Sequence, residues 1–214
     1  GVEEGTTISL GPARTPVEVV GFVSDSRFNG QGSLWGSSDT WAAVVAANRP
    51  DIRQRTLALA HQLRSGLVDS HVVVPGYTSR RYVAFRPMAW LAELDRLHAR
   101  GWVGLKAYPL YVELTVGAEG LWLDVWIAGS ALPPLREACF AWARARGHLF
   151  PSLPAKLNRA SISLHHEALL TKSDYGRGAW SDVEPVARAR FDHFIAVTLP
   201  PIMAASVEIE WPPA

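Results

Sequence analysis

Two carboxylates in the middle of the chain, Glu113 and Asp124, are spaced so that they could bind one ligand together. Residues 110–129 read "LYVELTVGAEGLWLDVWIAG", and their alternation predicts two strands joined by a turn at 117–120. This turn sets Glu113 opposite Asp124, and opposed Cβ atoms lie about 4.5–5.5 Å apart. Two carboxylates this close repel each other unless an Arg or Lys, a bound cation or water offsets the charge. They can also hold a hard divalent cation such as Mg²⁺, so Glu113 and Asp124 are candidate metal ligands.

The same register separates the hairpin into two faces. One face is aliphatic and predicts a core contact; it pairs Val116 with Leu121, Leu114 with Leu123 and Val112 with Val125. The other face pairs Glu113 with Asp124 between aromatic neighbours, Tyr111 with Trp126 and Thr115 with Trp122. These aromatic side chains favour a face that a helix, a protein partner or a ligand covers. The segment Glu113-Leu114-Thr115 lacks the carboxylate-x-lysine ending of the common restriction-type nuclease core, which counts against that class.

A second pattern mixes arginines with aromatic residues in "PGYTSRRYVAFRPMAW", residues 75–90. In a strand, Arg80, Tyr82 and Arg86 would share one face. Such a face can grip phosphates through guanidinium groups and stack a base on the ring. The alternative is a half-buried strand whose arginines pair with surface acids, or reach across to Glu113 and Asp124.

A third pattern is a strand, an Asp-Ser loop and a helix in "VVGFVSDSRFNGQG" followed by "DTWAAVVAAN". Over about thirty residues this order resembles the first block of the Gly-Asp-Ser esterases and lipases, which implies that Ser26 is the nucleophile. Ser24 stands where that family has Gly, and neither a Gly-x-Asn-Asp element nor an Asp-x-x-His motif is present. A serine nucleophile also needs a histidine within hydrogen-bond reach. The other interpretation is a Gly-rich surface loop.

The histidines offer a weaker metal pattern in His165-His166-Glu167. Adjacent residues of a strand point to opposite faces, so at most one of these histidines can join Glu167.

Composition limits the classes of protein. Hydrophobic residues make up 48% and charged residues 19% of 214 residues, which predicts an ordered globular chain, and we expect one domain over 1–214. The net charge of +1 gives no global basic field for nucleic acid, so such binding needs a local patch. The single Cys139 excludes an internal disulfide and fits a reducing cytoplasm. No apolar run approaches the roughly 20 residues of a membrane span, and residues 1–16 lack a signal-peptide pattern.

Local patterns place elements along the rest of the chain. We expect a strand at 17–23, a helix from Ser38 or Asp39 interrupted at Pro50, and a second helix that Gly66 ends. Further strands are predicted at 67–76, 80–87, 159–166 and 205–211, and further helices at 88–101, 133–147 and 181–195. Helices and strands interleave without a regular βαβ rhythm. The fold class predicted is therefore α+β, with a central mixed or antiparallel sheet that includes the 110–128 hairpin and is packed with amphipathic helices; the alternative is a three-layer α/β fold.

These patterns favour a binding module for a phosphate-bearing ligand or nucleic acid. Its ligand-binding residues would be Arg80, Tyr82, Arg86, Tyr111, Trp122 and Trp126. A first alternative is a hydrolase, either serine-based on Ser26 or a phosphodiesterase assisted by a divalent cation on Glu113 and Asp124. A second alternative is a structural subunit whose aromatic face meets another protein.

Overall fold

The computed structural model describes residues 7–10, 15–18, 38–103, 105–118, 120–151, 153–157, 161–175 and 180–214. Contacts within the chain divide it into two compact units, Gly1–Arg55 and Thr56–Ala214. The expectation of a single domain over 1–214 stays a prediction.

The first unit contains a short antiparallel pair, β1 (Thr7–Leu10) and β2 (Thr15–Glu18). The strand expected at 17–23 is thus described only to Glu18, and 19–37 lie outside the described residues. Helix α1 (Ser38–Asp69) begins in this unit and continues into the second. The predicted interruption at Pro50 is wrong, because the helix runs through it. Proline removes one backbone hydrogen bond and raises the free energy of a helix, but the turns on either side still form.

The second unit is built on a five-stranded sheet in which every neighbouring pair is antiparallel. Its strands follow in chain order: β3 (Val73–Thr78), β4 (Tyr82–Pro87), β5 (Leu110–Val116), β6 (Leu121–Ile127) and β7 (Ile162–Leu170). The helical elements are α2 (Met88–Ala99), α3 (Pro133–Arg144), α4 (Lys172–Tyr175), α5 (Trp180–His193), the π-helical turn η1 (Phe194–Thr198) and α6 (Leu199–Ser206). The predicted α+β class is confirmed, and the α/β alternative is wrong because its parallel crossovers do not occur in the described sheet.

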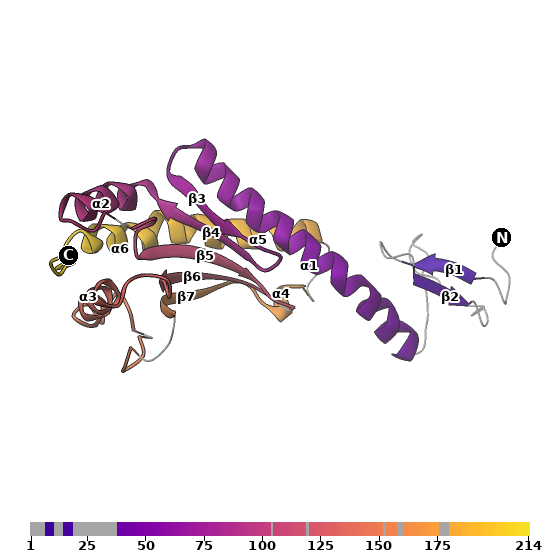
Figure 1. Ribbon diagram of the computed structural model, residues 1–214. Helices are drawn as coiled ribbons and strands as arrows, with labels where there is room; N and C mark the ends of the chain where they lie inside the picture. The colour runs from indigo at the N-terminus through magenta and orange to yellow at the C-terminus, as the bar shows by residue number, and fades with distance from the viewer. Residues whose placement is uncertain are drawn as a thin grey trace. The chain divides into compact units, whose positions relative to one another are not determined.

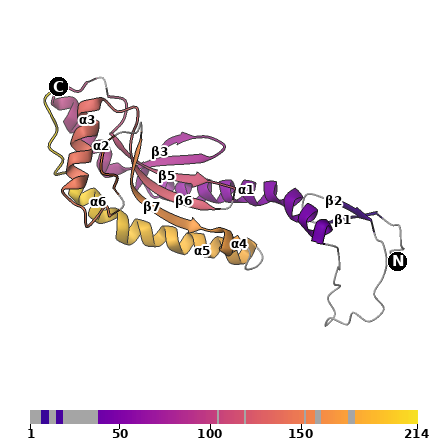
Figure 2. The same ribbon diagram turned by 90° about the horizontal axis from the view of Figure 1, so that it is seen from below.

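The predicted hairpin register is confirmed at every pair. Val112, Leu114 and Val116 face Val125, Leu123 and Leu121, and all six are fully or almost fully buried. They form one core cluster with buried residues of α1, α2, α3 and α5, so these helices cover the aliphatic face of the sheet. Figures 1 and 2 show α2 and α3 at the end of the sheet where β4 and β6 finish, and α4 at the opposite end.

The end of α1 differs from the prediction. Gly66 lies inside the helix, and the strand expected over 67–76 starts only at Val73. His71 takes the left-handed conformation instead, with φ of 57°. Its N–H donates to the Val68 carbonyl at 2.9 Å, and the Val72 N–H donates to the Leu67 carbonyl at 3.0 Å. These two bonds make the Schellman arrangement that satisfies the last helical carbonyls.

The terminal strand expected at 205–211 is also wrong. Residues 205 and 206 end α6, and 207–214 form no strand. This tail packs through side chains, because Ile209 is buried and the Trp211 ring meets Tyr108 edge-on. A β-type sequence forms a strand only where a sheet edge receives it. No helix in the described part of the chain is long and apolar enough to cross a membrane.

Candidate functional site

The face of the sheet opposite the core carries an open groove of about 520 Å³, here called the sheet groove. Strand alternation turns every second residue of β4, β5 and β6 toward it. Eleven residues line it: Tyr77, Tyr82, Tyr111, Glu113, Thr115, Trp122, Asp124, Trp126, Ser161, Ser163 and His166. Among these described residues are two carboxylates and one imidazole but no Lys or Arg, so the groove favours cations and hydrogen-bond donors over anions.

Glu113 lies at the floor of the sheet groove with only 4% of its surface exposed. The Tyr77 hydroxyl donates to its Oε2, and the Thr115 hydroxyl donates to its Oε1 at 3.2 Å. Burial raises the pKa of Glu113 from 4.5 to about 7, and the neighbouring Asp124 also raises it, against the hydrogen bond from Thr115. The Glu113 carboxyl therefore gains or loses its proton near neutral pH.

Asp124 faces Glu113 across the strand pair and is equally buried. Its Oδ1 accepts a hydrogen bond from the Ser163 hydroxyl at 2.9 Å and lies 2.9 Å from Nδ1 of His166. Both partners come from β7, where an extra residue between the pairs Val125–His165 and Trp126–Ser163 makes a β-bulge. Ser163 and His166 are three positions apart, so on a regular strand they would point to opposite faces. The bulge between them lets both side chains reach Asp124.

Tyr77 reaches the sheet groove through a second irregularity. The β3–β4 register shifts between Pro75 and Thr78, so that two residues of β3 lie opposite Ala84. One of them is Gly76, whose missing Cβ would lie 3.0 Å from Ala84. The Tyr77 ring packs edge-on against Tyr111 with ring centroids 6.0 Å apart. Tyr77 thereby joins the wall of the groove as well as donating to Glu113.

The indole rings form the other wall. Trp122 lies over the β5–β6 turn, where a Cβ on Gly117 would come within 2.1 Å of its ring and one on Gly120 within 2.7 Å. Two glycines therefore set the position of this ring. Trp126 packs beside Tyr111 and Ala84. Its indole N–H is buried without a hydrogen-bond acceptor among the described residues.

The predicted site residues divide between three places. Tyr82, Tyr111, Trp122, Trp126, Glu113 and Asp124 all line the sheet groove. Arg80 does not, because β4 begins at Tyr82 and Arg80 lies in the exposed β3–β4 turn. Arg86 shares the Tyr82 face of β4 but lines a neighbouring cavity. Ser26 lies outside the described residues.

Sequence reasoning did not place Tyr77, Ser163 or His166 beside the carboxylates, although these residues supply three of the four donors. From the sequence, residues could be assigned to a face of a strand only by strict alternation. Both strands that carry these residues contain bulges, which break the alternation. The expectation that at most one histidine joins Glu167 is confirmed. His165 lies 3.4 Å from Glu167, whereas His166 points to Asp124.

The site does not have the geometry of a serine nucleophile. Ser163 and His166 both bond to Asp124, whereas an activated serine needs the imidazole between itself and the carboxylate. The described residues also contain no group of three or more His, Cys, Asp or Glu side chains arranged to hold a metal ion.

The chain was compared with protein-family models, curated proteins and solved structures, and nothing matches it in any of the three.

Proposed function

We propose that the protein is a binding module whose ligand lies in the sheet groove. One observation carries the proposal: five aromatic side chains surround two buried carboxylates in a single groove. Aromatic faces bind flat rings by stacking, and carboxylates accept hydrogen bonds from amine donors. The ligand that this groove suits is a flat ring bearing amino groups.

A nucleobase combines these two properties. Stacking on an aromatic side chain contributes about 1–3 kcal/mol per base, and a carboxylate accepts well from an exocyclic amine such as N4 of cytosine. The phosphates of a nucleotide or a single strand would be repelled from Glu113 and Asp124 at the floor. Arg80 and Arg81 are exposed in the turn that precedes Tyr82, and their guanidinium groups would supply the opposite charge for the phosphates. The phosphate-bearing ligand therefore remains the class proposed, with its base in the groove.

The test is fluorescence anisotropy with labelled short oligodeoxycytidine and oligodeoxythymidine, at low and moderate salt. Oligodeoxycytidine should bind more tightly, because thymine has no exocyclic amine. Asp124→Asn should reduce this preference, since an amide presents one acceptor and one donor. Arg80→Ala should weaken both strands and reduce the salt dependence. Arg100→Ala, an exposed position at the end of α2, is the matched control and should bind as the parent does.

Two results would remove the proposal. One is the absence of binding to either strand at low salt. The other is equal binding of both strands that Asp124→Asn leaves unchanged, which would mean that the carboxylates do not contact the ligand.

The second candidate is a phosphodiesterase assisted by a divalent cation. The observation that favours it is the direct opposition of Glu113 and Asp124 across the hairpin. If the pair binds Mg²⁺ or Mn²⁺, millimolar metal should raise the melting temperature by mass action. Asp124→Asn should abolish that rise, and an unchanged melting temperature of the parent protein counts against this function.

A further inference from the structure

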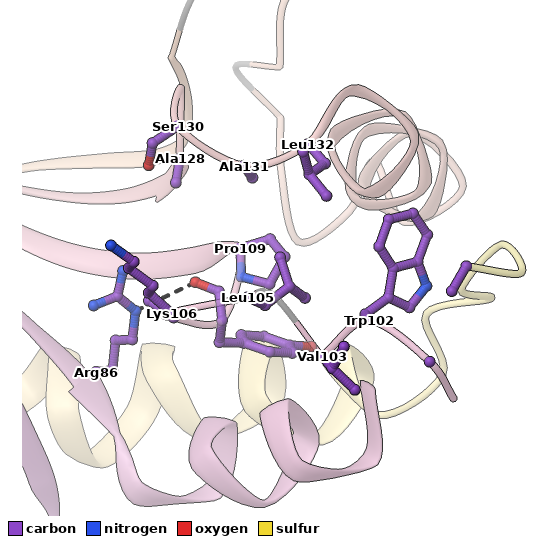
Figure 3. Close-up of a pocket in the computed structure, with 14 residues that line it drawn as sticks. Arg86, Trp102, Val103, Leu105, Lys106, Pro109, Ala128, Ser130, Ala131 and Leu132 are labelled. Carbon is purple, nitrogen blue, oxygen red and sulfur yellow. Dashed lines mark hydrogen bonds between the residues drawn. The ribbon is translucent and has the colours of Figure 1, made fainter. Parts of the chain in front are cut away.

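A second cavity, of about 630 Å³, lies at the end of the sheet where β4 finishes and β5 begins. Residues 101–103 and 105–109 form one wall, and residues of the segment 128–132 form another (Figure 3). Its volume is in the range of sites that hold small organic molecules. It is separate from the sheet groove, because the two sets of lining residues do not overlap.

Arg86 places a half-buried positive charge in this cavity. Its Nε donates to the Tyr108 carbonyl at 3.3 Å, and its guanidinium lies 5.7 Å from the centre of the Tyr111 ring. These contacts hold the half-buried group in place, as the dashed line in Figure 3 shows for the first of them. No carboxylate pairs with Arg86 within the described part of the chain. Burial lowers the pKa of this guanidinium, and the neighbouring Tyr111 hydroxyl acts in the opposite direction.

The rest of the lining adds one more cation and a largely apolar wall. Lys106 is the second basic residue, and no Asp or Glu is among the described residues that line the cavity. Figure 3 shows Arg86 and Lys106 toward one end of the view and Trp102 and Leu132 toward the other. Leu132 is 46% exposed, so the apolar wall continues to the surface.

We propose that this cavity binds an organic anion with an apolar body, its charged head at Arg86 and Lys106 and its body against Trp102 and Leu132. A guanidinium held in a fixed orientation forms paired hydrogen bonds with a carboxylate or a phosphate. The anion would supply the missing opposite charge, and the apolar wall would favour a hydrocarbon or aromatic body over a bare ion. The site is independent of the nucleobase site proposed for the sheet groove.

Isothermal titration calorimetry with four probes tests this proposal. Octanoate and octyl phosphate should bind. Octylammonium, which has the same chain and the opposite charge, should bind at least tenfold more weakly. Inorganic phosphate, which has no chain, should also bind at least tenfold more weakly. The comparison of octanoate with octyl phosphate distinguishes a carboxylate site from a phosphate site.

Variants locate the binding. Arg86→Gln should weaken octanoate or octyl phosphate at least tenfold, and Lys106→Ala, at an exposed position, should weaken it severalfold. Arg144→Ala, exposed on the last turn of α3, is the matched control. If Arg86→Gln fails to fold, Lys106→Ala and the octylammonium comparison still decide. Equal affinity for octylammonium, or unchanged affinity in Lys106→Ala and a folded Arg86→Gln, overturns the proposal.

Discussion

Glu113 and Asp124 lie directly opposite each other on β5 and β6, and each carboxylate has its own hydrogen-bond donors. Tyr77 and Thr115 donate to Glu113, while Ser163 and His166 contact Asp124. The repulsion expected from this pairing is therefore offset without an arginine or lysine bonded to either carboxylate in the described residues. Hydroxyl groups, the imidazole of His166 and the raised pKa of Glu113 together replace the expected counter-charge.

The proton on Glu113 makes stability depend on pH. Its folded pKa of about 7 lies above its ordinary value of 4.5, so between these values the folded state holds more protons than the unfolded state. The free energy of unfolding should then fall as pH rises from about 4.5 to 7, and level off above that. Glu113→Gln should remove this part of the fall, on the order of 1–3 kcal/mol because one pKa unit corresponds to about 1.4 kcal/mol.

Urea unfolding at pH 5, 6, 7 and 8 measures this effect. The difference between the parent and Glu113→Gln isolates the contribution of this residue from that of the rest of the protein. Glu137→Gln, exposed on α3, should follow the parent curve. Parallel curves for the parent and Glu113→Gln would show that Glu113 does not carry the pH dependence.

The two glycines under Trp122 allow its ring to be displaced. In Gly117→Ala the new methyl group would lie 2.1 Å from the ring, so the indole must swing off the turn. We expect a loss of about 1–3 kcal/mol in stability, the usual cost of overpacking, and weaker binding in the sheet groove. Near-ultraviolet circular dichroism reports the ring, and urea unfolding reports the stability.

Gly147→Ala is the control for this change, because nothing lies within 4 Å of a Cβ at that position. Its stability should stay within about 0.5 kcal/mol of the parent. A Gly117→Ala protein with unchanged stability and an unchanged aromatic spectrum would mean that Trp122 does not rest on the turn.

The hairpin register could be predicted because fourteen residues alternate without interruption around one turn. A slip of one position would have moved the carboxylate of one strand to the aliphatic face of the other, so only one register kept the two faces apart. The same rule failed for Tyr77, Ser163 and His166. A bulge reverses which residues of a strand face which side, and the sequence pattern does not show where a bulge occurs.

The errors at Pro50, Gly66 and the C-terminal segment have another cause. Each prediction rested on a local preference of about 1–3 kcal/mol, which packing elsewhere can outweigh. Arg80 was placed on the strand for a similar reason. The turn before β4 is held by the Ser79 hydroxyl, which accepts from the backbone N–H groups of Arg81 and Tyr82 at 3.2 Å, and so the strand starts later.

Asp174 should stabilise the junction of β7, α4 and α5. Its Oδ2 accepts from the Thr171 N–H and hydroxyl at 2.8 Å and from Arg190 at 2.9 Å. The hydrogen bond from Arg190, followed by those from Thr171, lowers the pKa of Asp174 to about 2 against the effect of burial. Asp174→Asn should cost about 2 kcal/mol, the usual contribution of a hydrogen bond to a charged group.

The lowered pKa also sets the direction of the acid effect. The stabilisation from Asp174 is complete above its ordinary pKa of 3.8 and is lost as pH falls through about 2. Unfolding followed by circular dichroism from pH 5 to 2 should therefore give free energies of unfolding for the parent and Asp174→Asn that converge at the acid end. Asp192→Asn, exposed on α5, is the control, and a constant gap between parent and Asp174→Asn across this range would contradict the assignment.

His71 holds the left-handed position that ends α1, with φ of 57°. A side chain in this conformation costs roughly 1–2 kcal/mol of stability, and glycine avoids that cost. Glycine also makes the unfolded chain more flexible, which cancels part of the gain in stability. His71→Gly should therefore raise stability by about 0.5–1 kcal/mol and the melting temperature by about 1–4 °C. The two backbone bonds from His71 and Val72 remain available to the variant. His148→Gly, at an exposed turn position without positive φ, should gain nothing. A melting temperature of His71→Gly at or below that of the parent would mean that the histidine side chain stabilises this turn by more than its backbone strain costs.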